Sequence, residues 1–167
     1  MVEHEFRAIE LATMDDLTGL SNRRGFWTIA RHTLALCRRV SRPATLLLFD
    51  LNDFKQINDT LGHMVGDRVL LDFGQELLST FRDSDVVARL GGDEFCVLLR
   101  GATEEEARRP VNDLERRLAK HPHLSYSVGF AEYDPNRHET AEDLVDDADA
   151  RMYEHKRSRR WEHWVPS

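Results

Sequence analysis

The chain has 167 residues, of which 41% are hydrophobic and 32% are charged. This length suits one domain with its own core. The formal net charge of −7 argues against a protein that binds nucleic acid polymers through a basic face. The chain has no candidate membrane span, and residues 1–15 are too polar for a signal peptide. Cys37 and Cys96 lie in apolar patterns that predict buried thiols, so we expect a cytoplasmic domain without membrane contact.

The hydrophobic periodicity predicts helices and strands in alternation. In chain order, we expect an amphipathic helix over residues 3–15, a helix over 22–40, a buried strand over 44–50, loop and short helical turns over 52–62, a helix over 65–78, strands over 86–90 and 95–99, a helix after Thr103, a strand over 124–131 and a helix after Thr140. Thr103 and Glu106 match a capping box. Pro110 predicts a kink in its helix or a restart of the helix at that residue.

From residue 44 onward the order is strand, helix, strand, strand, helix, strand. This is the split βαβ, ferredoxin-like or palm-type arrangement, an α+β fold with helices that flank one sheet. In its usual form the first strand lies beside the strand that follows the hairpin. The topology therefore predicts that Asp50, which ends the first strand, and Asp93 meet at one edge. Ligands commonly bind at such carboxyl ends of buried strands.

A predicted hairpin turn, Gly91-Gly92-Asp93-Glu94, joins the second and third strands. Paired glycines supply positive φ angles and let a ligand approach the backbone closely. Adjacent acids repel each other, which suggests a bound cation or a shared proton, whereas an ordinary solvated turn is the alternative. Carboxylates gathered in this way can hold two Mg²⁺ ions roughly 3.5–4 Å apart for phosphoryl or nucleotidyl transfer. Because neighbours in a strand face opposite sides, a bulge or the turn must re-aim one acid.

The sequence Gly91-Gly92-Asp93-Glu94-Phe95 resembles the signature of the GGDEF family of diguanylate cyclases. Further segments resemble the same family in its order and spacing: residues 16–24, 49–55, 57–59, 62–63, 66–67, 127–129 and 148–156. The resemblance implies a linker or helical stub over 1–14, a catalytic domain over 15–160 and a tail over 161–167. The chain departs from the family pattern at Arg159, where glycine is usual, and this departure puts triphosphate affinity in doubt.

Members of that family join two GTP molecules into cyclic di-GMP and release two pyrophosphates, with half-sites that meet across a homodimer. The resemblance implies that Mg²⁺, or alternatively Mn²⁺, is bound by Asp50, the Leu51 carbonyl, Asp93 and Glu94. Glu94 would be the base that takes the proton of the attacking 3′-hydroxyl, and Lys55 would stabilise charge on the phosphate.

The resemblance also implies a set of substrate-binding residues: the backbone of Asn52, Asp53 and Phe54 around the phosphates, Gly91 and Gly92 at the turn, Asn58, His63 and Asp67 at the nucleotide, and Lys156 and Arg160 at the triphosphate. A carboxylate at Asp67 suits the two donors on the Watson–Crick edge of guanine and rejects adenine. Without the resemblance, Lys55, Asn58 and His63 read as loop or turn residues, and Asp67 as an acid near a helix N-terminus.

Arg82-Asp83-Ser84-Asp85 is an R-x-x-D pattern that five residues separate from Gly91, the family's offset for an inhibitory product site. Arg82 can pair with phosphate or guanine acceptors, and Asp85 with guanine donors. An ion pair in a surface turn is the alternative. Two other functions stay open: a catalytically silent receptor for cyclic di-GMP, and a dimerisation module of a signalling protein whose input lies upstream.

Overall fold

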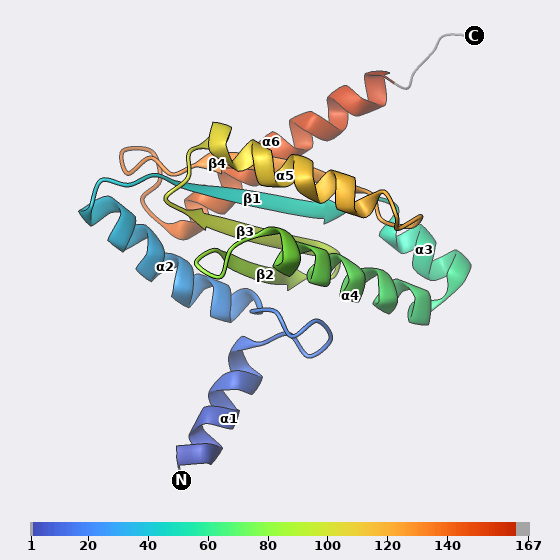
Figure 1. Ribbon diagram of the computed structural model, residues 1–167, viewed down its shortest axis with the longest axis horizontal. Helices are drawn as coiled ribbons and strands as arrows, with labels where there is room; N and C mark the ends of the chain where they lie inside the picture. The colour runs from blue at the N-terminus through green and yellow to red at the C-terminus, as the bar shows by residue number, and fades with distance from the viewer. Residues whose placement is uncertain (1, 163–167) are drawn as a thin grey trace.

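The computed structural model describes residues 2–162, in which two layers of helices enclose a four-stranded antiparallel sheet (Figure 1). The strand order is β2-β3-β1-β4. The elements are α1 (Val2–Thr13), α2 (Arg23–Arg39), β1 (Ala44–Leu51), α3 (Phe54–Leu61), α4 (His63–Thr80), β2 (Val86–Gly91), β3 (Glu94–Arg100), α5 (Glu104–Leu118), β4 (Tyr126–Glu132) and α6 (Ala141–Glu162). The predicted split βαβ fold is confirmed, with β1 beside β3.

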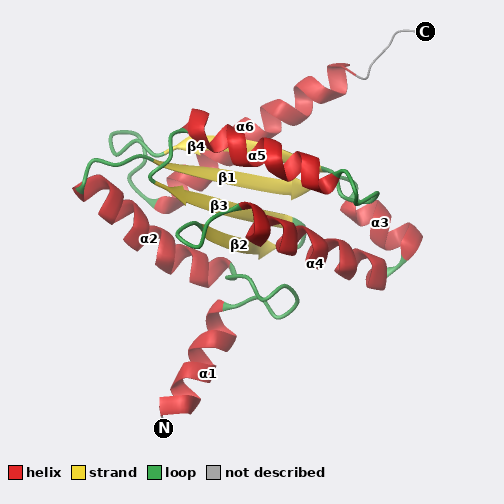
Figure 2. Cartoon of the chain, in the orientation of Figure 1, coloured by secondary structure: helices red, strands yellow, loops and turns green. Residues whose placement is uncertain are grey.

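Strand β1 is central to the fold because helices cover both of its faces. Leu47 and Phe49 pack in the core beneath α4 and α5, whereas Leu46 and Leu48 pack in the core beneath α2 and α6. This alternation follows from the two-residue period of a strand. Figure 2 shows helices on both sides of the sheet. Burial of both faces explains why the strand reads as a continuous apolar run.

Helix α6 rests directly on the backbone of β4. A Cβ atom added at Gly129 would lie 2.0 Å from the carbonyl oxygen of Ala148 and 2.7 Å from the backbone nitrogen of Met152. No side chain fits between the strand and the helix at this point. The predicted cap at the start of α6 is present, since the Asp143 N–H donates to the Thr140 hydroxyl at 3.2 Å.

Several boundaries differ from those predicted. Residues 54–61 form a complete helix, α3, and α4 begins at His63, two residues before the predicted start. Helix α5 has the predicted capping box and continues through Pro110 without restarting. An interior proline removes one backbone hydrogen bond, but α5 keeps its buried apolar face, and tertiary packing supplies most helical stability. The residues on that face are Ala107, Val111, Leu114 and Leu118.

Helix α1 projects from the body of the domain and ends at Thr13, two residues before the predicted end (Figure 1). The amide of Asn22 joins it to α2. Its Oδ1 accepts from the Gly25 N–H at 2.9 Å as the N-cap of α2, and its Nδ2 donates to the Ala12 carbonyl at 3.0 Å. One side chain thus satisfies a free group at the end of each helix.

A turn at Asp15 connects α1 to the rest of the domain. The Asp15 carboxylate accepts from the N–H of Thr18 at 2.9 Å and from its hydroxyl at 2.7 Å. Arg89 on β2 lies 3.2 Å away and also donates to the Gly92 carbonyl at 2.9 Å. Burial opposes ionisation of Asp15, but the Thr18 hydrogen bonds and the Arg89 charge outweigh burial and lower its pKa.

The two cysteines lie in the core beneath α2 and α6. Cys37 and Cys96 are buried free thiols, as predicted. Over residues 2–162, none of the helices combines the length and apolarity that a bilayer crossing requires.

We expect Asp15→Asn to destabilise the fold by about 1–3 kcal/mol at neutral pH, because the variant loses a charged hydrogen-bond acceptor. The lowered pKa makes the Asp15 contribution fully present above the unfolded value of about 3.9 and lost as pH falls through the folded value. The difference between parent and variant should therefore shrink below about pH 4. Urea unfolding at several pH values measures this difference in the free energy of unfolding between parent and variant.

Asp16→Asn is the matched control, since Asp16 is exposed and forms no hydrogen bond or ion pair within the described residues. A loss for Asp16→Asn equal to that for Asp15→Asn would contradict the assignment.

Candidate active site

The carboxyl end of β1 meets the turn between β2 and β3 at one end of the sheet, on the right in Figure 1. Asp50 lies directly opposite Glu94, the first residue of β3. Asp93 lies in the turn, and its carbonyl oxygen accepts a 3.1 Å hydrogen bond from the Leu51 N–H. The fold thus brings the three acids that the sequence singled out to one place.

The turn also resolves how two adjacent acids can share a site. Gly92 has φ of +41°, a conformation that side chains rarely adopt, and Asp93 completes the turn. Glu94 pairs with Gly91, and the register of β2 shifts between Arg89 and Gly91. Because Asp93 belongs to the turn and Glu94 to the strand, the alternation of a regular strand does not force them onto opposite faces.

The carboxylates at this end lie in an environment that disfavours negative charge. Burial raises the pKa of Asp93, and the charge of Asp50 raises it further. Burial also raises the pKa of Glu94, with Asp149 on α6 adding to the effect and Arg23 opposing it. A bound cation would relieve this repulsion.

Two basic side chains partly compensate these acids. The Lys156 Nζ on α6 contacts the Asp50 carboxylate directly. Arg23, at the start of α2, donates to the Leu90 carbonyl at 3.1 Å, and its guanidinium lies 3.9 Å from Glu94. Lys156 was expected to contact a triphosphate, whereas Arg23 was not predicted as a site residue. The only sequence signal for Arg23 was its place in the motif over residues 16–24.

The donor atoms here suit a hard divalent cation, although over residues 2–162 no three His, Cys, Asp or Glu side chains form a preformed metal cluster. Mg²⁺ typically takes one or two protein carboxylates, water and substrate phosphates. Within a strand, the N–H and C=O of one residue point to the same side. Because the Leu51 N–H points to Asp93, the Leu51 carbonyl faces the acids too.

Helices α3 and α4 bring further predicted residues to the surface. The side chains of Lys55, His63 and Asp67 are exposed and make no hydrogen bond or ion pair within the described chain. Asp67 lies in the second turn of α4, because the helix begins at His63. The helix dipole acts mainly on the first turn, so it explains Asp67 poorly.

Asn58 on α3 lies against Gly66 on α4. A Cβ atom at Gly66 would lie 1.8 Å from the Asn58 Oδ1, so the position of this amide depends on the missing side chain. The sequence placed Asn58 and Gly66 in one motif but gave no indication that they touch.

The segment after β1 is held by β4 and by Ser125, the residue before that strand. The Asn52 N–H donates to the Ser125 carbonyl at 2.8 Å, and the Asn52 side chain bonds to the hydroxyls of Ser125 and Ser127, each at 2.9 Å. Asp53 follows with φ of +59°, and Phe54 begins α3. The two serine contacts were not predicted. Their only signal was Ser127-Val128-Gly129 in the family pattern.

The R-x-x-D segment forms the turn before β2. Asp85 accepts from the Arg82 N–H at 3.0 Å, and the Arg82 Nε lies 3.6 Å from the same carboxylate. The ion pair of the alternative interpretation is therefore present. The Asp85 side chain is only 2% exposed, however, and its buried Oδ1 has no hydrogen-bond partner among the described residues. Both residues line a cavity of about 570 Å³.

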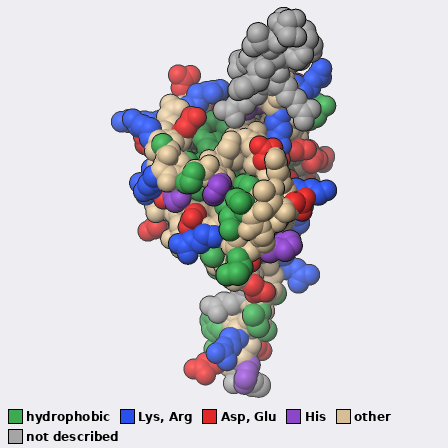
Figure 3. Space-filling model, turned by 90° about the vertical axis from the view of Figure 1, so that its right-hand side faces the viewer, with side chains coloured by type: hydrophobic (Ala, Val, Ile, Leu, Met, Phe, Trp, Pro, Cys, Tyr) green, Lys and Arg blue, Asp and Glu red, His purple; other side chains and the backbone are tan. Residues whose placement is uncertain are grey.

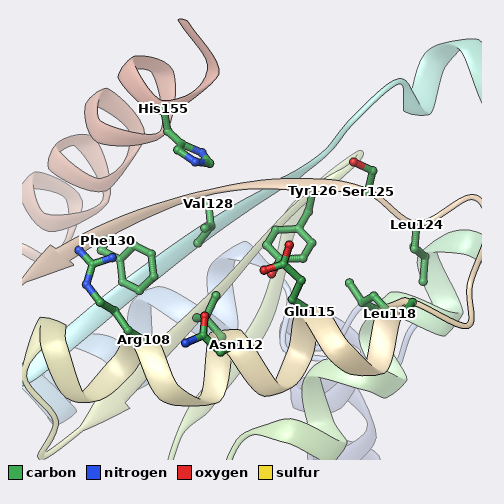
Figure 4. A pocket seen from close by; sticks show the side chains of 12 residues that line it. Arg108, Asn112, Glu115, Leu118, Leu124, Ser125, Tyr126, Val128, Phe130 and His155 are labelled. Atoms are coloured by element: carbon green, nitrogen blue, oxygen red, sulfur yellow. The ribbon is translucent and has the colours of Figure 1, made fainter. Parts of the chain in front are cut away.

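A separate cavity of about 510 Å³ lies between α5 and the edge strand β4 (Figure 4). Its apolar wall includes Val128 and Phe130, and Arg108 lies 4.8 Å above the Phe130 ring. None of the site residues predicted from the sequence lines this cavity. Ser125, which was not predicted, does line it.

Figure 3 views the molecule from the end that carries the acids, where side chains of both charge signs are interspersed. The Arg160 and Arg159 side chains and residues 163–167 lie outside the described part of the structure, so what the sequence implies for them stays a prediction.

Comparison with known proteins identifies the chain. The family model described as "Diguanylate cyclase, GGDEF domain" matches residues 12–162. The chain belongs to the GGDEF family. DgcC of Escherichia coli K12, named a probable diguanylate cyclase, is 38% identical over 96% of this chain. A Pseudomonas aeruginosa protein named cyclic di-GMP phosphodiesterase NbdA is 36% identical over 88% of this chain.

This GGDEF chain spans less than half the length of these relatives, 45% of DgcC and 20% of NbdA. The coiled coil and GGDEF domain of DgcB from Caulobacter crescentus, solved in complex with c-di-GMP, superposes with a TM-score of 0.87 at 25% identity. That match covers 93% of this chain and 86% of the DgcB chain. The GGDEF fold, expected from the motif, is confirmed.

We expect Gly66→Ala to weaken binding of GTP, the substrate that the family resemblance implies, by about 10-fold, because the new methyl group displaces the Asn58 amide. The free energy of unfolding should change little, because the higher helix propensity of alanine, up to about 1 kcal/mol over glycine, offsets the cost of displacing the Asn58 side chain. Calorimetric titration with GTP measures the affinity.

Gly74→Ala in the same helix is the control, because its Cβ would make only ordinary contacts, the nearest at 3.4 Å. GTP affinity that is unchanged in Gly66→Ala would remove Asn58 from the nucleotide site.

Proposed function

We propose that the chain is a diguanylate cyclase that condenses two GTP molecules into cyclic di-GMP and two pyrophosphates. The observation that carries this proposal is the meeting of Asp50, Asp93 and Glu94 at the end of the central strand. A receptor or a dimerisation module would not need this group of mutually repelling acids.

In the proposed reaction, the 3′-hydroxyl of one GTP attacks the α-phosphate of the other. Glu94 takes the hydroxyl proton, and its raised pKa makes it a better proton acceptor than an exposed carboxylate. Lys55 and Lys156 offset charge on the phosphates. Asp50, Asp93 and the Leu51 carbonyl would hold Mg²⁺, with Mn²⁺ as the alternative, and the ion would supply Lewis acidity at the reacting phosphate.

Guanine selectivity follows from the residues on α3 and α4. The Asp67 carboxylate accepts from the N1–H and the exocyclic amine of guanine, a donor pair that adenine lacks. Asn58 meets the base through its amide, and His63 contacts the nucleotide beside it. The phosphates are contacted separately, by the backbone N–H groups of Asp53 and Phe54.

Two chains must face each other, because each contributes one half-site. Helix α1 supplies a surface for pairing. Val2, Phe6 and Ile9, which recur at four- and three-residue spacing, are exposed by 65%, 65% and 61%. Hydrophobic side chains are visible on this projecting helix in Figure 3. A coiled-coil seam between two copies would bury them. The reaction uses GTP, so we place the domain in the cytoplasm.

The deciding experiment is product analysis after the purified chain is incubated at high concentration with GTP and Mg²⁺, beside Glu94→Gln. We expect cyclic di-GMP from the parent and at least a 100-fold lower rate from the variant, since general-base catalysis contributes about 10²–10⁴-fold. Activity per chain should rise with protein concentration, because only the dimer reacts.

Glu106→Gln, at the capping box of α5, controls for loss of a surface carboxylate. A Glu94→Gln variant as active as the parent would exclude Glu94 as the base. A parent dimer that binds GTP and yields no product would favour the receptor or dimerisation module.

We further propose that cyclic di-GMP inhibits the enzyme at Arg82 and Asp85. The buried, unpaired Oδ1 of Asp85 is an acceptor that a guanine donor would satisfy, and Arg82 is exposed enough to reach a phosphate. The DgcB structure solved with c-di-GMP supports binding of this ligand by a similar domain.

Arg82→Ala should leave the initial rate unchanged and raise the concentration of cyclic di-GMP that halves the rate by about 10-fold or more. Rate measurements with added product test this expectation. Arg109→Ala, a nearby exposed arginine on α5, provides a comparison. Inhibition unchanged in Arg82→Ala would leave the turn with a structural role only.

A further inference from the structure

We propose that Ser127, assisted by Ser125, is a positioning residue that holds Asn52 and thereby aims the Leu51 carbonyl and the Asp53 and Phe54 amides at the substrate. This inference rests on the proposed function, because it concerns the same site.

Asn52 is bound at three points, to Ser127 on β4 and to Ser125 just before the strand. Its Oδ1 accepts from the Ser127 hydroxyl at 2.9 Å, its Nδ2 donates to the Ser125 hydroxyl at 2.9 Å, and its N–H donates to the Ser125 carbonyl at 2.8 Å. Ser127 is 2% exposed and lies opposite Asp50 in the strand register. The side-chain amide of Asn52 and its backbone N–H are therefore all occupied by Ser125 and Ser127, which leaves the Asp53 and Phe54 amides as the phosphate donors of this segment.

The first consequence concerns the peptide bond between Leu51 and Asn52. In a trans peptide, the C=O and N–H of one unit point in opposite directions. Because the Asn52 N–H points to β4, the Leu51 carbonyl points to the other side of β1, where Asp93 lies. The backbone hydrogen bond to Ser125 thus fixes the plane of the peptide whose oxygen is the proposed metal ligand, and the two serine hydroxyls hold the Asn52 side chain next to it.

The second consequence concerns the next residue. Asp53 has φ of +59° and ψ of +23°, the left-handed conformation, which costs a residue other than glycine about 1 kcal/mol or more. Such a conformation persists only where its surroundings fix it. On one side Asn52 is held by the serines, and on the other the Asp53 carbonyl accepts from the Ile57 N–H at 3.0 Å. Loss of the serine contacts would let the amides of Asp53 and Phe54 turn away from the phosphates.

Figure 4 places Ser125 at the rim of the cavity between α5 and β4, and Tyr126 next to it. The positioning contacts therefore come from the edge strand, on the opposite side of β1 from the hairpin that carries Asp93 and Glu94. The carboxyl end of β1, where substrate would bind, is thus held by β3 on one side and by β4 on the other.

The test compares Ser127→Ala with Ser127→Thr, which retains a hydroxyl donor, and with Thr45→Val as the matched control. Thr45 is buried as Ser127 is, and its hydroxyl donates to the Ala102 carbonyl at 2.9 Å, but it lies on β1, at the end of that strand far from Asp50. We measure GTP affinity calorimetrically at several Mg²⁺ concentrations, KM and kcat, and the free energy of unfolding.

We expect Ser127→Ala to raise both the dissociation constant of GTP and the Mg²⁺ concentration needed for half-maximal binding by about 10-fold, the usual size of an outer-shell effect. Ser127→Thr should lie near the parent. Thr45→Val should lose comparable stability and keep the parent's GTP and Mg²⁺ dependence. Asn52→Ala should reproduce the Ser127→Ala result, and it replaces that variant if Ser127→Ala does not fold.

Ser127→Ala with the GTP and Mg²⁺ dependence of the parent would overturn the proposal, as would an equal loss of affinity in Thr45→Val. The binding measurement does not depend on turnover. A parent that binds GTP without forming product would contradict the proposed cyclase activity and leave the positioning role to be decided by the affinities. A parent that binds no GTP would contradict both.

Discussion

The antiparallel pairing of β1 with β3 is the constraint on which the rest of the structure depends. Both faces of β1 are buried, so a slip of one residue would turn its side chains toward the wrong cores. The register is therefore fixed by packing, and it sets Asp50 opposite Glu94. Hydrophobic burial elsewhere along the same strand offsets the electrostatic repulsion among the acids gathered there. Core and site are in this sense one arrangement.

Much of this arrangement could be predicted from the sequence because it depends on local patterns. The apolar run over 44–50, the paired glycines and the capping box at Thr103 each have a signature that depends on few neighbours. Strand order then followed from the sequence of elements, and it brought Asp50 to Asp93. The family resemblance added roles for Asn58, Asp67 and Lys156 that composition could not supply.

What the sequence could not show are contacts between distant segments. Arg23 reaches Glu94 across 71 positions, and Ser127 reaches Asn52 across 75, with no local pattern to announce either pair. For Pro110, the restart of the helix, one of the two predicted alternatives, was wrong. Propensity rules count the missing hydrogen bond, but packing of the apolar face of α5 keeps the helix continuous. Tertiary context decided each of these cases.

The absence of a side chain at Gly129 has a consequence beyond packing. Helix α6 approaches the sheet most closely there, at Ala148 and Met152, and Lys156 lies one helical turn farther along the same rigid rod. The spacing between strand and helix therefore sets where the Lys156 ammonium meets Asp50. A single methyl group at position 129 would push α6 away from β4 and displace Lys156 from Asp50. The charge balance among the acids would then change without any substitution at the site itself.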